Sequence, residues 1–161
     1  MRQLYLDCDG VLADFDEGAE LVFGMHPRKY EYLHGSKEFW RTLHETSEFY
    51  AELPLMLDAR ALYNACAHWN PIILTGCPQG GWAQAQKLRW RDRNFPGVNM
   101  ITTLSKNKRD HAKPGDVLVD DMEKYRHLWE EMGGVFVLYT RGMPLPKLLS
   151  SIRVAMTGGG K

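Results

Sequence analysis

The sequence predicts an α/β fold built on a doubly wound parallel sheet of five strands. Short apolar runs rich in Val, Ile, Leu and aromatic residues recur along the chain, at 3–6, 71–75, 98–103, 116–120 and 134–140. Gly, Pro or Asp residues bound these runs, as expected for strands buried on both faces. Helical patterns lie between most of them, and such alternation is typical of a parallel sheet covered by helices.

Four segments between or after these strands have the spacing of helices. In 124–132, apolar residues recur at i, i+3, i+4 and i+7, and Gly133 then ends the pattern. The segment 144–155 repeats this spacing. We also expect helices at 57–69 and 80–95, the second with a weaker amphipathic pattern.

The long interval after the first strand predicts a small helical cap. It holds helical segments at 15–24, 37–45 and 47–53 and many aromatic residues. We therefore divide the chain into three parts: a catalytic core formed by 1–14 and 57–156, a cap insertion at 15–56, and a flexible tail at 157–161.

Composition narrows the classes of partner. The 161 residues suffice for about one domain, and 20 basic side chains balance 20 acidic ones. A neutral chain has no basic field for nucleic acid polymers, whereas a small phosphorylated molecule is compatible with it. The N-terminus lacks a long apolar segment, so we expect a soluble, cytosolic protein. Cys8, Cys66 and Cys77 have no paired spacing, and we expect reduced thiols that fill buried space.

Polar residues follow the predicted strands where ligands bind in open parallel sheets. In chain order they are Asp7 and Asp9, Thr75 and Gly76, the basic segment 105–109, and the pair Asp120 and Asp121. Single acidic strand ends are often only turn or capping residues. The order acid, hydroxyl, lysine, acid pair on one sheet instead predicts a working site.

The acids predict a magnesium site. Asp7 and Asp9 are separated by one residue, so on a regular strand they point the same way. With Asp120 and Asp121 nearby, the carboxylates would repel one another strongly in a low dielectric. A cation removes this repulsion, and oxygen ligands without a His or Cys cluster favour Mg²⁺.

A lysine and a threonine add what a phosphoryl group needs, namely positive charge and a hydroxyl donor. The reaction that these parts predict is phosphoryl transfer to an aspartate followed by hydrolysis. One carboxylate acts as nucleophile, and a second donates a proton to the leaving oxygen.

Four short motifs resemble those of the haloacid dehalogenase (HAD) superfamily. They are "LDCDGVLADF" (6–15), "ILTG" (73–76), a lysine, and "VLVDD" (117–121), and the resemblance covers essentially the whole chain. "DGVLADF" followed by a helical cap is most similar to the 5′(3′)-deoxyribonucleotidase branch. The resemblance implies a HAD-like, Rossmann-like core and a phosphatase activity.

The resemblance also implies residue roles. Asp7 would be the nucleophile that forms an aspartyl phosphate, and Asp9 the general acid and base whose backbone carbonyl also binds Mg²⁺. Thr75 and the amide of Gly76 would hold the transferring phosphoryl group.

The metal ligands and the third-motif lysine follow from the same resemblance. Asp121 would lie closest to Mg²⁺, with Asp120 binding it directly or supporting it from behind. Lys106, Lys108 and Lys113 all precede the acid pair, and the family spacing favours Lys108.

Cap aromatics stack on the base in the resembling nucleotidases. The matching positions are Phe15, Phe39, Trp40, and Phe49 or Tyr50. The alternative is that these rings form the core of the cap itself, the commoner use of aromatics in a helical stripe.

The leading hypothesis is a Mg²⁺-dependent phosphomonoesterase acting on nucleoside 5′-monophosphates. A sugar or other metabolite phosphate is the alternative substrate, and a phosphoaspartate receiver module is the alternative without catalysis. Two further expectations concern single groups. Lys87 or Arg89 could reach a substrate, but we place both on a solvated helix face. We expect Asp14 to cap a helix or to act as a hinge at the mouth of the cap.

Overall fold

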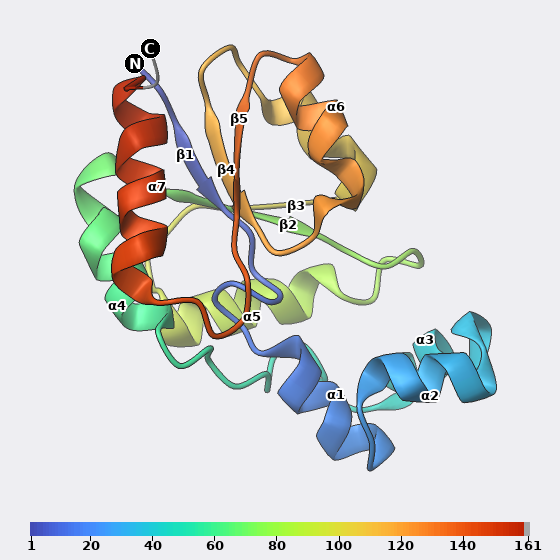
Figure 1. Ribbon diagram of the computed structural model, residues 1–161. Helices are drawn as coiled ribbons and strands as arrows, with labels where there is room; N and C mark the ends of the chain where they lie inside the picture. Colours follow the sequence, from blue (N-terminus) through green and yellow to red (C-terminus); the bar gives the residue numbers. More distant parts are fainter. Residues whose placement is uncertain (160–161) are drawn as a thin grey trace.

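A five-stranded parallel sheet forms the centre of the computed structural model, which describes residues 1–159 (Figure 1). The strand order is β3-β2-β1-β4-β5, so the chain moves outward from β1 in both directions. The strands are β1 (Leu4–Leu6), β2 (Ile72–Gly76), β3 (Met100–Thr103), β4 (Val117–Asp120) and β5 (Val135–Leu138). The predicted doubly wound sheet is confirmed.

Helices cover both faces of the sheet because successive strand residues point to opposite sides. On one face, Leu4 and Leu6 of β1 share a buried cluster with Ile152. On the other, Tyr5 packs with Trp129. The covering elements are α4 (Ala59–Cys66), α5 (Gln84–Asn94), α6 (Arg126–Glu131) and α7 (Leu145–Thr157), with 3₁₀ turns η1 (Ala67–Trp69), η2 (Ser105–His111) and η3 (Glu123–Tyr125).

Three helices form a group beside the carboxyl ends of the strands (Figure 1). They are α1 (Phe15–Phe23), α2 (Pro27–His34) and α3 (Ser36–Glu45). The sequence analysis did not predict α2, although Pro27 at its first turn is a helix-start signal. Phe23 of α1 stacks on Tyr30 of α2 with ring centroids 4.0 Å apart, so aromatic contacts hold these short helices together.

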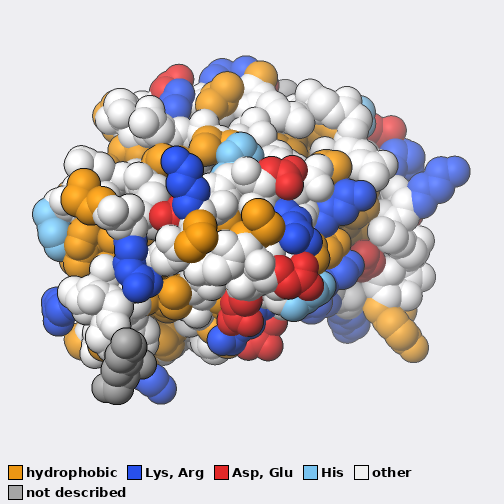
Figure 2. All heavy atoms as spheres, turned by 90° about the horizontal axis from the view of Figure 1, so that it is seen from above, with side chains coloured by type: hydrophobic (Ala, Val, Ile, Leu, Met, Phe, Trp, Pro, Cys, Tyr) orange, Lys and Arg blue, Asp and Glu red, His pale blue; other side chains and the backbone are white. Residues whose placement is uncertain are grey.

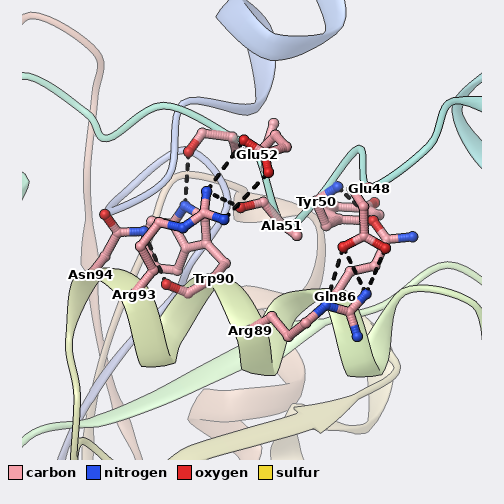
Figure 3. Close-up of polar contacts among 10 residues, drawn as sticks. Glu48, Tyr50, Ala51, Glu52, Gln86, Arg89, Trp90, Arg93 and Asn94 are labelled. Atoms are coloured by element: carbon pink, nitrogen blue, oxygen red, sulfur yellow. Dashed lines mark hydrogen bonds and ion pairs between the residues drawn. The ribbon is translucent and has the colours of Figure 1, made fainter.

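The helix predicted at 47–53 is wrong, because this segment forms turns. Glu48 has a φ of +55°, which interrupts a right-handed helix. The segment is held from outside, by side chains of α5, rather than by its own backbone ladder (Figure 3).

One face of α5 holds this return linker from the cap to the core. The contacting side chains recur at the i, i+3, i+4 and i+7 spacing of one helix face. Gln86 accepts the Tyr50 N–H at 2.8 Å, and Trp90 Nε1 donates to the Leu53 carbonyl at 2.9 Å. Outer ion pairs join Arg89 to Glu48 and Arg93 to Glu52 (Figure 3).

Asp14 joins the first linker, the segment 7–14 that leads from β1 into the three-helix group, to the core. Its carboxylate accepts the Glu17 N–H at 3.1 Å and so caps α1, as expected. It also pairs with Arg141 from the loop after β5, a contact that we did not predict. The Asp14 N–H donates to the Pro54 carbonyl at 2.7 Å, so the two linkers run side by side.

The remaining expectations concern thiols, tail and surface. Cys8, Cys66 and Cys77 are buried free thiols. Thr157, placed in the predicted tail, is the last residue of α7, and residues 160–161 lie outside the described part. Basic and acidic side chains are interspersed on the face seen in Figure 2. Within residues 1–159, the structure contains no helix with the length and apolar character needed to cross a bilayer.

Trp90→Phe tests how the return linker is held. The change keeps an aromatic ring but leaves the buried Leu53 carbonyl without its donor, so we expect the free energy of unfolding to fall by about 1–3 kcal/mol. Urea denaturation measures this. Arg89→Ala, which breaks an exposed ion pair, is the control and should cost less than about 1 kcal/mol. Equal effects of both variants would contradict this account.

Candidate active site

A cavity of about 380 Å³ lies at the carboxyl ends of the strands and is lined by both the core and the cap helices. Its volume falls within the range of small-molecule sites. The lining residues that the sequence analysis had named are Asp7, Asp9, Phe15, Phe39, Trp40, Tyr50, Gly76, Lys106, Lys108, Asp120 and Asp121.

Lys108 joins two of the predicted acids. Its Nζ atom lies 2.8 Å from Asp7 and 2.8 Å from Asp120, and all three side chains are buried. Asp7 follows β1 and Asp120 ends β4, and these paired strands bring the two carboxylates together. Lys108 reaches them from η2.

For both Asp7 and Lys108, burial and the neighbouring opposite charges shift the pKa in opposite directions. Burial, and then the nearby Asp120, raise the pKa of Asp7 well above its usual value, while Lys108 acts in the opposite direction. Burial lowers the pKa of Lys108, but Asp7 and Asp120 outweigh it and raise that pKa overall. Lys108 is therefore a fixed positive charge beside the carboxylates.

Asp121 completes a group of three carboxylates. Asp7, Asp120 and Asp121 each offer an oxygen, and these oxygens lie within 4.8 Å of one another. Gly10, with a φ of +85°, makes room for this arrangement, because a Cβ atom there would overlap the Asp121 carboxylate. The Asp121 side chain is exposed at the cavity, yet partial removal of water by the surrounding protein, and then the charge of Asp120, raise its pKa to about 7.

Three converging carboxylates fit a hard divalent cation. Their oxygens repel one another, and this repulsion adds to the larger effect of burial in raising the pKa values of Asp7 and Asp121. Carboxylate oxygens are the ligands that Mg²⁺ prefers, and no His or Cys belongs to this group in the described part of the chain. Among residues 1–159, the donor set therefore matches the predicted metal.

Asp9 lies apart from this group and pairs with a different lysine. Its Oδ2 atom accepts from Lys87 Nζ at 2.6 Å, while Oδ1 is buried without a hydrogen-bond partner among the described residues. The solvated position expected for Lys87 is wrong, since its side chain is 1% exposed. Arg89 does lie on the solvated face, paired with Glu48.

The second motif is split between two positions. Gly76 lines the cavity, and a Cβ atom there would overlap the Ser105 hydroxyl, which also faces the cavity. Thr75 is fully buried, does not line the cavity, and accepts from Lys87 Nζ at 2.8 Å. Ser105, the first residue of the basic segment 105–109, therefore supplies a cavity hydroxyl that we did not predict.

The cap aromatics divide between cavity and cap interior. Phe15, Phe39, Trp40 and Tyr50 line the cavity, and Trp40 is 37% exposed. Phe49, predicted to contact substrate, does not line it; its ring is buried edge-on against Phe15 at 5.5 Å. The packing of the cap itself explains Phe49.

Two of the three candidate lysines do not contact the acids. Lys106 is exposed at the cavity, and Lys113 is exposed on the loop before β4. Lys87 is the lysine that sequence reasoning missed. The sequence signal for its burial is the weak amphipathic pattern of α5, in which Lys87 and Trp90 occupy the buried positions.

The fold is that of HAD hydrolases. A HAD family hydrolase from Deinococcus radiodurans with bound phosphate and sodium has a TM-score of 0.58 at 14% identity, covering 98% of this chain and 96% of that one. L-2-haloacid dehalogenase from Xanthobacter autotrophicus, with chloropropionic acid covalently bound, gives 0.57 at 12% identity, covering 99% and 83%. A hydrolase from Streptococcus pneumoniae gives 0.56 at 13%, covering 92% and 98%. No protein-family model and no curated protein matches the sequence.

Asp121→Asn tests the electrostatic cost of the carboxylate group. Because folding raises the pKa of Asp121 from 3.8 to about 7, ionisation is easier in the unfolded chain, and stability falls as pH rises through that interval. Without Mg²⁺ at about pH 8, we expect the variant to melt at a higher temperature than wild type, with the difference shrinking below about pH 4.

Thermal melts with and without Mg²⁺ measure both effects. Mg²⁺ should raise the melting temperature of wild type more than that of Asp121→Asn. Asp110→Asn, which removes an exposed carboxylate of η2, is the control and should behave as wild type. A variant that melts below wild type at every pH would contradict the interpretation.

Proposed function

We propose that the protein is a Mg²⁺-dependent phosphomonoester hydrolase that acts through an aspartyl phosphate on Asp7. The observation that carries this proposal is the bridge of Lys108 between Asp7 and Asp120, beside Asp121, in a cavity shared by core and cap. It supports the proposal because a buried carboxylate, a fixed positive charge and a group of three carboxylates lie close together. The phosphate-bound hydrolase of the same fold is consistent with it.

In the first step, an Asp7 oxygen attacks phosphorus, and the bond from phosphorus to the ester oxygen breaks. Lys108 balances the charge that collects on the phosphoryl oxygens and on Asp7. Asp9 donates a proton to the leaving oxygen, so that an alcohol departs.

In the second step, a water molecule attacks the phosphorus of the aspartyl phosphate. Asp9, now a carboxylate, accepts the proton from this water. The bond between phosphorus and Asp7 breaks, and inorganic phosphate leaves. We assign the Gly76 amide and the Ser105 hydroxyl as donors to the phosphoryl oxygens because both residues line the cavity, whereas Thr75 supports the site from behind through Lys87.

Asp7, Asp120 and Asp121 would hold Mg²⁺. When bound, the ion supplies positive charge to the phosphoryl oxygens and removes the repulsion among the three carboxylates.

The proposed substrate is a nucleoside 5′-monophosphate. The cavity has acids and lysine on its core side, where a phosphoryl group would bind, and Phe15, Phe39 and Trp40 on its cap side. These rings offer the flat apolar surface on which a base stacks. A sugar phosphate would use the same core side but gain little from the rings.

Asp9 favours an ester over a haloacid as substrate, although one structure of this fold is a dehalogenase. A halide ion leaves without a proton, whereas an alkoxide needs one, and Asp9 is a second acid that lines the cavity and can supply it. Asp9 and the cap also argue against a phosphoaspartate receiver, which needs neither.

Asp7→Asn tests the proposed nucleophile. With Mg²⁺ present, wild type should hydrolyse p-nitrophenyl phosphate and at least one nucleoside 5′-monophosphate, and the variant should lose at least about 10³-fold in kcat. Phosphate release measures this, with Asp110→Asn as the control. A wild type inactive on a panel of nucleotides and sugar phosphates, or an active Asp7→Asn, would refute the proposal.

Trp40→Ala tests base stacking. Since Trp40 is 37% exposed and lines the cavity, its removal should leave the fold intact. We expect KM for a nucleoside 5′-monophosphate to rise about tenfold, the loss of roughly one stacking contact. KM for p-nitrophenyl phosphate should change little. A uniform change for both substrates would favour a sugar or other metabolite phosphate instead.

A further inference from the structure

We propose that Lys87 is a positioning residue that fixes the orientation of the Asp9 carboxylate for proton transfer. This inference rests on the proposed function and adds a second buried lysine with its own task. Lys87 lies on α5, its side chain is 1% exposed, and it does not line the cavity. It therefore acts through its neighbours rather than on a substrate.

The ammonium group of Lys87 has no donor left for a substrate. It carries three N–H bonds, and it has three acceptors. These are Asp9 Oδ2 at 2.6 Å, Thr75 Oγ1 at 2.8 Å and the Gly76 carbonyl at 2.9 Å. The last two acceptors belong to β2, so the sheet fixes the ammonium and the ammonium fixes Asp9.

This contact makes the two oxygens of Asp9 unequal. Oδ2 is held by Lys87, whereas Oδ1 is buried and has no partner among the described residues. Asp9 is a cavity-lining residue, and Lys87 is not. The contact through Oδ2 thus anchors the carboxylate in one orientation, and this orientation is the one in which Asp9 meets the cavity.

The surroundings of Lys87 keep it in this position. The Tyr50 ring lies 4.5 Å from its Nζ atom, and the backbone N–H of Tyr50 is held by Gln86, the neighbour of Lys87 on α5. A buried lysine costs free energy unless its charge and donors are satisfied. Here the aromatic face and three acceptors satisfy it, so the carboxylate cannot swing toward Asp7 without breaking the network.

Lys87→Met tests this assignment because two substrates depend on Asp9 to different extents. An alkyl phosphate, such as a nucleoside 5′-monophosphate, needs a proton on its leaving oxygen, whereas p-nitrophenolate leaves without one. The measure is the ratio of kcat/KM for the alkyl phosphate to that for p-nitrophenyl phosphate. Each kcat/KM value reports only the steps up to departure of the leaving group. Hydrolysis of the aspartyl phosphate therefore does not affect the ratio.

We expect Lys87→Met to lower this ratio at least about tenfold, part of the effect of a misplaced general acid. A merely structural role would lower both kcat/KM values together and leave the ratio unchanged, which would overturn the inference. In an Asp9→Asn background, adding Lys87→Met should not lower the ratio further, because the group that it positions is already lost.

Lys113→Met is the control, because it removes an exposed lysine from the loop before β4. It should leave both kcat/KM values at the wild-type level. Circular dichroism checks folding, and if Lys87→Met does not fold, Lys87→Gln, which keeps a neutral donor, takes its place with a smaller expected fall in the ratio. A wild type that hydrolyses neither ester refutes the proposed function, and the inference with it. A wild type that hydrolyses both, with an unchanged ratio in the variant, refutes the inference alone.

Discussion

Repulsion among four carboxylates is the constraint on which the rest of this site depends. Asp7, Asp9, Asp120 and Asp121 lie at the ends of two neighbouring strands, where a low dielectric makes like charges costly. Two buried lysines reduce this repulsion. Lys108 pairs with Asp7 and Asp120, and Lys87 pairs with Asp9. Two negative charges are left over, which is the charge that one divalent cation neutralises. The two lysines thus offset part of a repulsion that still lowers the stability of the protein without a cation.

The sheet and most of its helices could be predicted from the sequence because their signals are local. Runs of apolar residues mark the strands, and the acids follow them directly. The failures have physical reasons too. Residues 47–53 look helical by composition, but α5 holds them in turns, and such a tertiary contact leaves no trace in the segment itself. Lys87 is predicted to be exposed because lysine almost always is. Its burial is stable only because residues of other elements accept hydrogen bonds from its ammonium group.

The cap aromatics show the same limit. The sequence places several rings in the insertion, but their division between cavity and cap interior depends on how three short helices meet. Phe15 belongs to both groups of rings, since it lines the cavity and also packs edge-on against the buried Phe49. A change at Phe15 would therefore disturb the cap and the cavity together, whereas Trp40 is accessible to a cleaner test.

The hydrogen bonds between α5 and the return linker affect where the chain should be cut in a cap-exchange chimera. The predicted insertion spans 15–56, yet residues 48–53 are hydrogen-bonded to α5 and adjoin the Lys87 contacts. A chimera that exchanges caps at the ends of the insertion would import foreign residues onto this helix face. Cutting instead between α3 and Glu48 keeps the native linker, and with it the support of Asp9. The exchangeable unit is thus smaller than the insertion itself.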